Sequence, residues 1–214
     1  VRMGMMLCAP AGNDILFDDS LCEQGRNFCN KIWNCFRLIK GWEVADNEMP
    51  ATNQWGVEWF KAVLAKTQEE VADLFSKYRL SEALMAIYKL YCDEFSGWYL
   101  EIIKPAYGQP IDRATYEQTI QFMDTMLKLL HPFMPFITEE LWQAIEERQE
   151  GESLMVSPLN AEQTLDKAAQ LLENATQCFD IISAIRNIRA QKNISPKEVL
   201  TLVAPSELPA VVTK

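Results

Sequence analysis

The chain is dominated by apolar residues that recur every three or four positions, which is the spacing of one face of an α-helix. The clearest run predicts a helix that ends at Lys104-Pro105, because proline removes a helix hydrogen bond and clashes with the preceding turn. The apolar face of this helix comprises Leu80, Leu84, Ile87, Tyr91, Phe95, Trp98 and Ile102.

Other helices are predicted before and after this run. The first begins near Ser20, which forms an S-x-x-E capping box with Glu23, and ends near Gly41. The remaining helices are expected over residues 52–75, 116–130, 135–150 and 165–193. Residues 14–18 and 199–203 have the pattern of short strands, and 153–160 form a connector. The predicted fold class is therefore mainly α, a helical bundle with short irregular or β segments at both ends.

The composition is that of a folded protein without a membrane segment. The chain has 214 residues, of which 49% are hydrophobic, enough for a substantial core. No stretch approaches the roughly 20 apolar residues of a membrane helix, and the N-terminus lacks a signal-peptide pattern. The six cysteines contain no C-x-x-C pair, which favours buried, reduced thiols. We therefore expect a cytoplasmic location.

The charge restricts how this chain can bind nucleic acid. With 20 basic and 30 acidic residues the formal net charge is −10. Such a balance argues against a broad basic surface that coats nucleic acid non-specifically. Any RNA site must be local.

A local candidate lies on the first predicted helix. At about 100° per residue, one side collects apolar residues, namely Phe28, Ile32, Cys35, Phe36 and Ile39. The other side collects Arg26, Asn30, Trp33, Asn34, Arg37 and Lys40. Cations suit phosphates, amides suit base edges and aromatic rings suit stacked bases. The pattern is equally compatible with an ordinary amphipathic helix in which Trp33 packs at the core edge and the amides bridge neighbouring helices.

A second candidate lies near the end of the last predicted helix. Arg186, Arg189 and Asn193 share a face there, with Asn187 and Lys192 close by. The alternative is electrostatic, because cations in the last turns stabilise the negative end of the helix dipole.

The sequence contains no convincing catalytic constellation, metal-ligand spacing or phosphate-binding loop. The single histidine, His131, precedes proline at a helix junction, which favours a structural or capping role. Adjacent acidic pairs such as Glu139-Glu140 point about 100° apart on a helix and are expected to be solvated. We predict no catalytic residue, metal or cofactor in this chain.

Three segments resemble a known family. The segments are RNFCNKIWNCFR at 26–37, LHPFMPFITEELW at 130–142 and IRNIRAQKNISP at 185–196. They resemble, in order and separation, the signatures of the anticodon-binding domain of valyl-tRNA synthetases. The chain departs from that pattern at residues 53–56 and 157–159.

The resemblance implies that the chain is one part of a valine–tRNA ligase, an enzyme that uses ATP with Mg²⁺ to attach valine to tRNA-Val. The catalytic and editing domains would lie outside this chain, which by itself would be inactive and would act in cis with them. Residues 1–18 would be a stem, 19–196 the anticodon-binding bundle and 197–214 the start of a C-terminal segment.

The expected partner is the anticodon loop and stem of tRNA-Val, with neither DNA nor membrane. The candidate tRNA-binding residues are Arg26, Asn30, Lys31, Trp33, Asn34, Arg37, Lys40, Arg186, Asn187, Arg189 and Lys192. Three alternatives stay open: a helical protein-interaction module, the equivalent domain of an isoleucyl or leucyl enzyme, and an enzyme with a site among Asp93, Glu94, Glu101 and His131.

Overall fold

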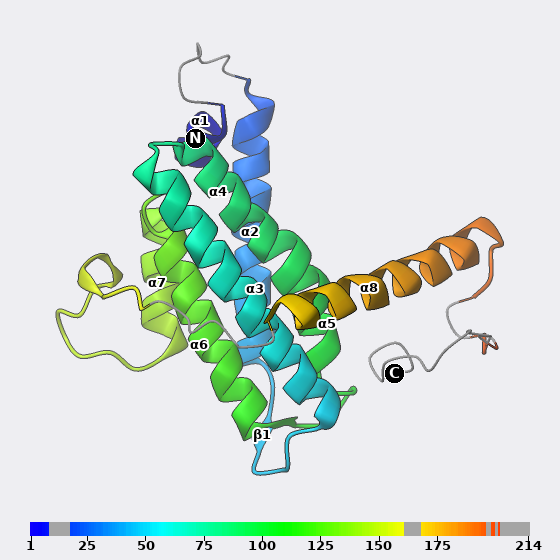
Figure 1. Cartoon of the computed structure of the whole chain (residues 1–214). Helices are drawn as coiled ribbons and strands as arrows, with labels where there is room; N and C mark the ends of the chain where they lie inside the picture. The colour runs from blue at the N-terminus through cyan, green and yellow to red at the C-terminus, as the bar shows by residue number, and fades with distance from the viewer. Residues whose placement is uncertain (9–17, 161–167, 196–197, 200, 202–214) are drawn as a thin grey trace. The chain divides into compact units, whose positions relative to one another are not determined.

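The computed structural model describes residues 1–8, 18–160, 168–195, 198–199 and 201 (Figure 1). The chain divides into two compact units, Val1–Thr164 and Leu165–Lys214. Helices account for most of the described residues, which confirms the predicted mainly α bundle.

The first unit contains most of these helices. Its elements are α1 (Arg2–Leu7), α2 (Ser20–Lys40), β1 (Val44–Ala45), α3 (Ala51–Ser76), α4 (Leu80–Lys89), η1 (Leu90–Tyr99), α5 (Leu100–Ile103), β2 (Ile111–Asp112), α6 (Arg113–Leu130), α7 (Pro135–Ile145) and η2 (Leu154–Val156). In this bundle α3 packs against α4, η1 and α6, while α7 packs against α6 and α2 (Figure 1). The short α1 packs against α2 and α4.

An aromatic cluster forms the centre of the bundle. The ring of Phe60 on α3 lies 4.8 Å from that of Tyr99, 5.3 Å from that of Phe95 and 5.1 Å from that of Phe122 on α6. All four residues are essentially inaccessible to solvent. Rings at these separations and tilts contribute stabilisation beyond the area that they bury.

A cap that joins several elements starts α6. The buried carboxylate of Asp112 accepts a hydrogen bond from the backbone N–H of Thr115 at 2.8 Å, as an N-cap does. Its second oxygen accepts from the Asn53 amide at 3.1 Å. The preceding backbone forms the short parallel pair of β1 and β2, in which Ala45 lies opposite Asp112. The sequence had not predicted these two-residue strands.

The helix predicted to end at Lys104-Pro105 is not α-helical throughout. It begins as α4, continues as the ten-residue π-helix η1 and ends as α5. A π-helix forms i→i+5 hydrogen bonds and so places more residues in each turn than the 3.6 of an α-helix. The wider turn brings Tyr99 into the core, whereas the α-helical spacing had favoured Trp98, which is only half-buried.

One predicted helix end and one predicted cap were wrong. The helix after Pro135 ends at Ile145 and not near Glu150. The predicted capping box at Ser20 does not form, and the Asp18 carboxylate instead accepts a hydrogen bond from the Ser20 N–H at 2.9 Å. Residues 14–17 of the first predicted strand, and residues 200 and 202–203 of the last, lie outside the described residues.

In the second unit the described helix is α8 (Ala168–Gln191). Its C-terminus is closed by Asn193, which has a φ of 52°. The N–H of Ile194 donates to the Arg189 carbonyl at 2.9 Å, and that of Asn193 donates to the Ala190 carbonyl at 3.2 Å. This pair of bonds around a left-handed residue is a Schellman motif, in which asparagine is tolerated better than most residues.

Candidate nucleic-acid interface

The helix α2 has one buried face, as the sequence predicted. Phe28, Ile32, Cys35 and Ile39 are buried, and Phe36 is half-buried. The Phe28 ring lies 4.9 Å from that of Tyr88 and 5.6 Å from that of Tyr91. Because this face is anchored, the opposite side of α2 is held towards solvent along its length.

The solvent side of α2 carries a row of residues that we call the outer stripe: Arg26, Asn30, Trp33 and Arg37. Their spacing of four, three and four residues aligns them on one helix face. All four are exposed, and Trp33 keeps 39% of its surface accessible while its ring lies 5.9 Å from that of Phe36. Trp33 therefore presents an aromatic surface between two guanidinium groups.

The ionic partners of this stripe are few. Arg26 has only a fully exposed contact with Glu23 at 4.0 Å, a geometry worth little in water. Within the described part of the chain, the Arg37 guanidinium forms no hydrogen bond or ion pair. Both side chains can therefore bind an incoming anion without breaking a strong internal contact.

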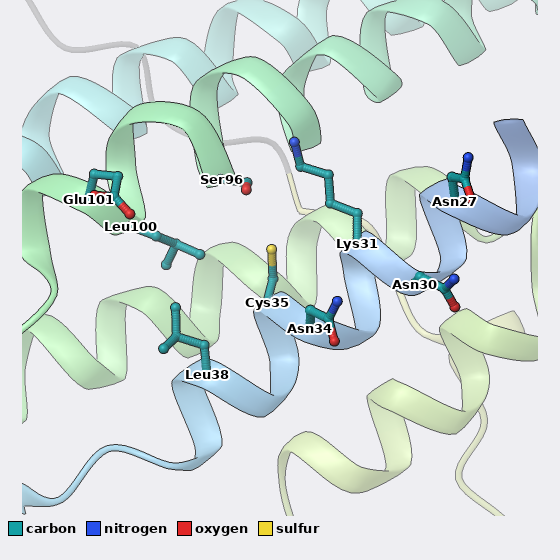
Figure 2. Close-up of a pocket in the computed structure, with 9 residues that line it drawn as sticks. All are labelled: Asn27, Asn30, Lys31, Asn34, Cys35, Leu38, Ser96, Leu100 and Glu101. Carbon is teal, nitrogen blue, oxygen red and sulfur yellow. The ribbon is translucent and has the colours of Figure 1, made fainter. Parts of the chain in front are cut away.

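A second row on α2, adjacent to the outer stripe, faces a groove. Asn27, Lys31, Asn34 and Leu38 line one wall, and Asn30 and Cys35 contribute at its edges. The other wall is formed by Ser96 of η1 with Leu100 and Glu101 of α5. The groove has a volume of about 370 Å³. Figure 2 shows the Lys31 side chain extending towards η1, and Leu100 pointing towards Leu38 and Cys35.

Two of the predicted site lysines are tied to neighbouring helices. Lys31 Nζ donates to the carbonyl oxygen of Cys92 at 3.2 Å, and Lys40 Nζ donates to that of Ile145 at 3.2 Å. These carbonyls belong to η1 and to the last residue of α7, so each lysine joins α2 to another element. An ammonium group has three donors, so each retains capacity for a ligand.

The thiols beside this groove are poor nucleophiles. Burial raises the pKa of Cys35, although a hydrogen bond with Ser96 and the charge of Lys31 oppose the shift. Burial likewise raises the pKa of Cys92. Both groups are therefore neutral thiols near physiological pH and act as small apolar side chains, Cys35 in this groove and Cys92 in a neighbouring cleft.

The predicted site residues on α8 have a different environment. The Arg189 guanidinium donates to the carbonyl oxygens of Ser195 at 2.8 Å and Glu198 at 2.9 Å. It thereby holds the chain that follows the helix. Arg186, Asn187 and Lys192 are exposed. These bonds go to the chain beyond the helix and not to the last carbonyls of α8, so helix-terminus electrostatics stays an interpretation of the sequence.

The structure shows the contacts of the residues that were considered for an unrecognised enzyme site. The Nδ1 atom of His131 lies 2.8 Å from the Thr138 hydroxyl, which itself donates to the Met134 carbonyl, so the histidine links α6 to α7. Glu101 is paired with Lys104 at 2.6 Å. Burial, together with the charge of Asp93, raises the pKa of Glu94. Asp93 lines a different cleft from Glu101.

The described residues contain neither a group of metal-ligating side chains nor a membrane-spanning helix. In that part of the chain no three histidine, cysteine, aspartate or glutamate side chains are grouped to hold a metal ion. No helix among the described residues has the length and apolar character needed to cross a membrane.

Asn27, Ser96 and Glu101 were not predicted to bind RNA, although Glu101 was named in the alternative of an enzyme site. Asn27 lies one helical turn before Lys31 on α2, so a helical wheel that included the groove-facing row would have selected it. Ser96 and Glu101 come from a helix that is distant in sequence, and only the packing of α2 against η1 brings them to the groove. No sequence signal places Ser96 and Glu101 opposite α2.

The comparisons with known proteins agree on one family. The family profile described as "Anticodon-binding domain of tRNA ligase" matches residues 57–204. A valine–tRNA ligase of Phocaeicola vulgatus is 66% identical over 202 residues, which cover 94% of this chain and 23% of that protein. One of Bacteroides thetaiotaomicron is 62% identical over 212 residues, covering 98% and 24%. One of Christiangramia forsetii is 46% identical over 198 residues, covering 92% and 22%.

The family profile begins within α3, so it does not include α2. The alignment that covers 98% of the chain does include that helix. The chain spans about a quarter of the length of these curated relatives. Its helical bundle, the order of its three motifs and these matches agree that the chain belongs to the family of anticodon-binding domains of tRNA ligases.

Proposed function

We propose that this chain binds the anticodon loop and stem of tRNA-Val, as part of a longer valine–tRNA ligase. The observation that carries the proposal is the outer stripe, which places Arg26, Trp33 and Arg37 together at the surface of a chain with a net charge of −10. Membership of the anticodon-binding family and the names of its relatives support it.

The chemistry of the stripe suits a folded RNA loop. The two guanidinium groups can bind phosphates, and the Trp33 ring between them can stack on an unpaired base. Lys31 and Lys40 would add charge while holding α2 in place, and Arg186, Asn187 and Lys192 would supply a second contact. Arg189 would act mainly by ordering the end of α8. The acidic surface elsewhere would repel phosphates that arrive in other places.

The rest of the reaction belongs to other domains in this proposal. Valine attachment would take place in a catalytic domain in cis, where ATP and Mg²⁺ bind, and this chain alone would not catalyse it. Residues 1–18 would be the stem leading from that domain, 19–196 the anticodon-binding part and 197–214 the start of a further segment. The reduced thiols expected from the sequence support a cytoplasmic location.

The test is a filter-binding titration of the 214-residue chain with tRNA-Val and a non-cognate tRNA at two salt concentrations. We expect tighter binding of tRNA-Val and a steep loss of affinity with salt, because phosphate contacts release counterions. Arg26→Ala combined with Arg37→Ala should lower the affinity by about tenfold or more, the effect of losing charged hydrogen bonds. The slope of log affinity against log salt should fall by about 1.4 to 1.8.

Lys77→Ala combined with Arg79→Ala is the matched control. It removes the same charge from exposed residues at the junction of α3 and α4, where both are paired with nearby acids. It should change neither the affinity nor the slope appreciably. Binding that is insensitive to salt would contradict the proposal and favour a protein-interaction module. Equal losses in the two double variants would contradict the assignment of the outer stripe.

A further inference from the structure

The two walls of the groove beside the outer stripe differ in chemistry. The α2 wall carries three amides, Asn27, Asn30 and Asn34. The opposite wall carries the Ser96 hydroxyl and the Glu101 carboxylate. Leu38 and Leu100 come from opposite walls and supply apolar surface between these polar groups (Figure 2). The groove thus combines hydrogen-bonding edges with apolar faces.

Many of the polar groups of the groove have no internal partner. Within the described residues, none of the three amide side chains forms a hydrogen bond. The Oε2 atom of Glu101 accepts from Lys104 at 2.6 Å, and in the same described part of the chain Oε1 has no partner. Water satisfies these groups in the free protein. A ligand that offers complementary donors and acceptors would replace that water without breaking internal bonds.

The combination of hydrogen-bonding groups and leucine side chains in this groove suits a planar heteroaromatic ring better than a phosphate. A phosphate in this groove would meet the Glu101 carboxylate as well as the Lys31 ammonium, and repulsion by the carboxylate would offset the attraction of the lysine. Leucine side chains would also remove solvent from a phosphate without replacing its hydrogen bonds. A nucleobase has two apolar faces and a polar edge. Its exocyclic amino group would donate to a carboxylate, and amides bind base edges in pairs of hydrogen bonds.

We infer that this groove takes one unstacked nucleobase bearing an exocyclic amino group, with Glu101 and Asn34 on opposite walls as specificity-determining residues. The inference rests on the proposed function, because the outer stripe would hold the adjoining sugar-phosphate backbone. The volume of about 370 Å³ falls in the range of about 300–1,000 Å³ that is usual for small-molecule sites. Lys31 fixes the spacing of the walls through its bond to the Cys92 carbonyl.

The test uses the 214-residue chain and RNA hairpins that carry the anticodon stem and loop of tRNA-Val. In one hairpin at a time, a loop cytosine is replaced by uracil or a loop adenine by inosine, which exchanges the amino group for a carbonyl. The unmodified chain should prefer the amino-bearing base at one position by about tenfold or more. Glu101→Gln should reduce that preference to about threefold or less, because the amide can also donate to the carbonyl.

The salt slope separates this effect from general RNA binding. Glu101→Gln should leave the slope unchanged, since it removes no phosphate contact. Asn34→Ala should also reduce the preference at the same position. Glu70→Gln is the charge-matched control, because Glu70 is exposed on α3 and does not line the groove. That variant should retain the full preference.

The possible failures are distinguishable. If the unmodified chain binds hairpins with a salt slope, but no exchange changes its affinity, the groove inference is overturned and the proposed function stands. The same holds if Glu101→Gln and Asn34→Ala keep the full preference. If the unmodified chain shows no salt-sensitive RNA binding, both ideas are overturned, and the first titration alone reveals it.

Discussion

The helices α2 and α8 present similar sequence patterns with different structural outcomes. Each carries arginine, lysine and asparagine residues close together with few acids among them. On α2 the Arg37 guanidinium and the asparagine amides have no partner among the described residues. On α8 the Arg189 guanidinium is occupied by two backbone carbonyls. The same residue types are available for a ligand in one helix and partly committed to the fold in the other.

The chain that follows each helix explains this difference. Arg37 and Arg189 both lie in the last turn of their helices. After α8 the backbone places the carbonyl oxygens of Ser195 and Glu198 where they accept from Arg189, whereas among the described residues no group accepts from Arg37. A basic residue near a helix C-terminus is therefore available for a ligand where the following chain leaves it without a partner.

The largest effect should come from the anchored face of α2. Phe28→Ala should lower the free energy of unfolding by about 3–5 kcal/mol, because it leaves a cavity against Tyr88 and Tyr91. Leu172→Ala on α8, where the leucine is only half-buried, should cost about 1 kcal/mol. Urea denaturation followed by circular dichroism measures both. Similar losses would mean that α8 is anchored as firmly as α2.

An intermediate effect on the free energy of unfolding should distinguish Arg189 from Arg37. Arg189→Ala should lower the free energy of unfolding by about 1–2 kcal/mol, because two charged hydrogen bonds to backbone are lost. Arg37→Ala should change it by less than about 0.5 kcal/mol, as is usual for an exposed surface residue. Thermal denaturation compares the two, with the RNA titration as the second measurement. The comparison fails if Arg37→Ala proves the more destabilising of the two.

The smallest predicted effect concerns two tyrosine hydroxyls in the core, one with a hydrogen-bond partner and one without. Burial raises the pKa of both Tyr91 and Tyr99, so both phenols stay protonated. The Tyr99 hydroxyl lies 2.8 Å from that of Thr119, but among the described residues the Tyr91 hydroxyl has no hydrogen-bond partner. Tyr99→Phe should therefore destabilise the protein by about 1 kcal/mol, and Tyr91→Phe should stabilise it by up to about 1 kcal/mol. Equal shifts in urea midpoint would refute this pairing.

Periodicity predicted where the helices lie more reliably than how they end or wind. The predicted helix from Ser20 to Gly41 matches α2 within a residue, because Phe28, Ile32 and Ile39 mark the buried face unambiguously. The apolar run after Leu80 did not reveal the π-helix, because residues spaced four apart fit both an α-helix and a π-helix. The end of α7 was missed because the polar residues after Ile145 contain no apolar position and no glycine until Gly151.

The candidate interface was predictable only on one side. The sequence identified the outer stripe, because all its members lie within one helix and obey its period. It could not identify the second wall, because Ser96 and Glu101 reach the groove through tertiary packing between segments far apart in the chain. Nor could it show that Lys31 and Lys40 bond to carbonyls of neighbouring helices.

The orientation of the second wall of the groove depends on the number of residues in η1 and on their π winding. Removing one residue from a helix turns every following residue by about 100°, and rewinding the wider π turns as α turns rotates them in the opposite sense. A deletion that is accommodated by α winding would therefore leave Leu100 and Glu101 close to their present direction. Rewinding η1 without a deletion would instead move both residues out of the groove, although no side chain in it had changed.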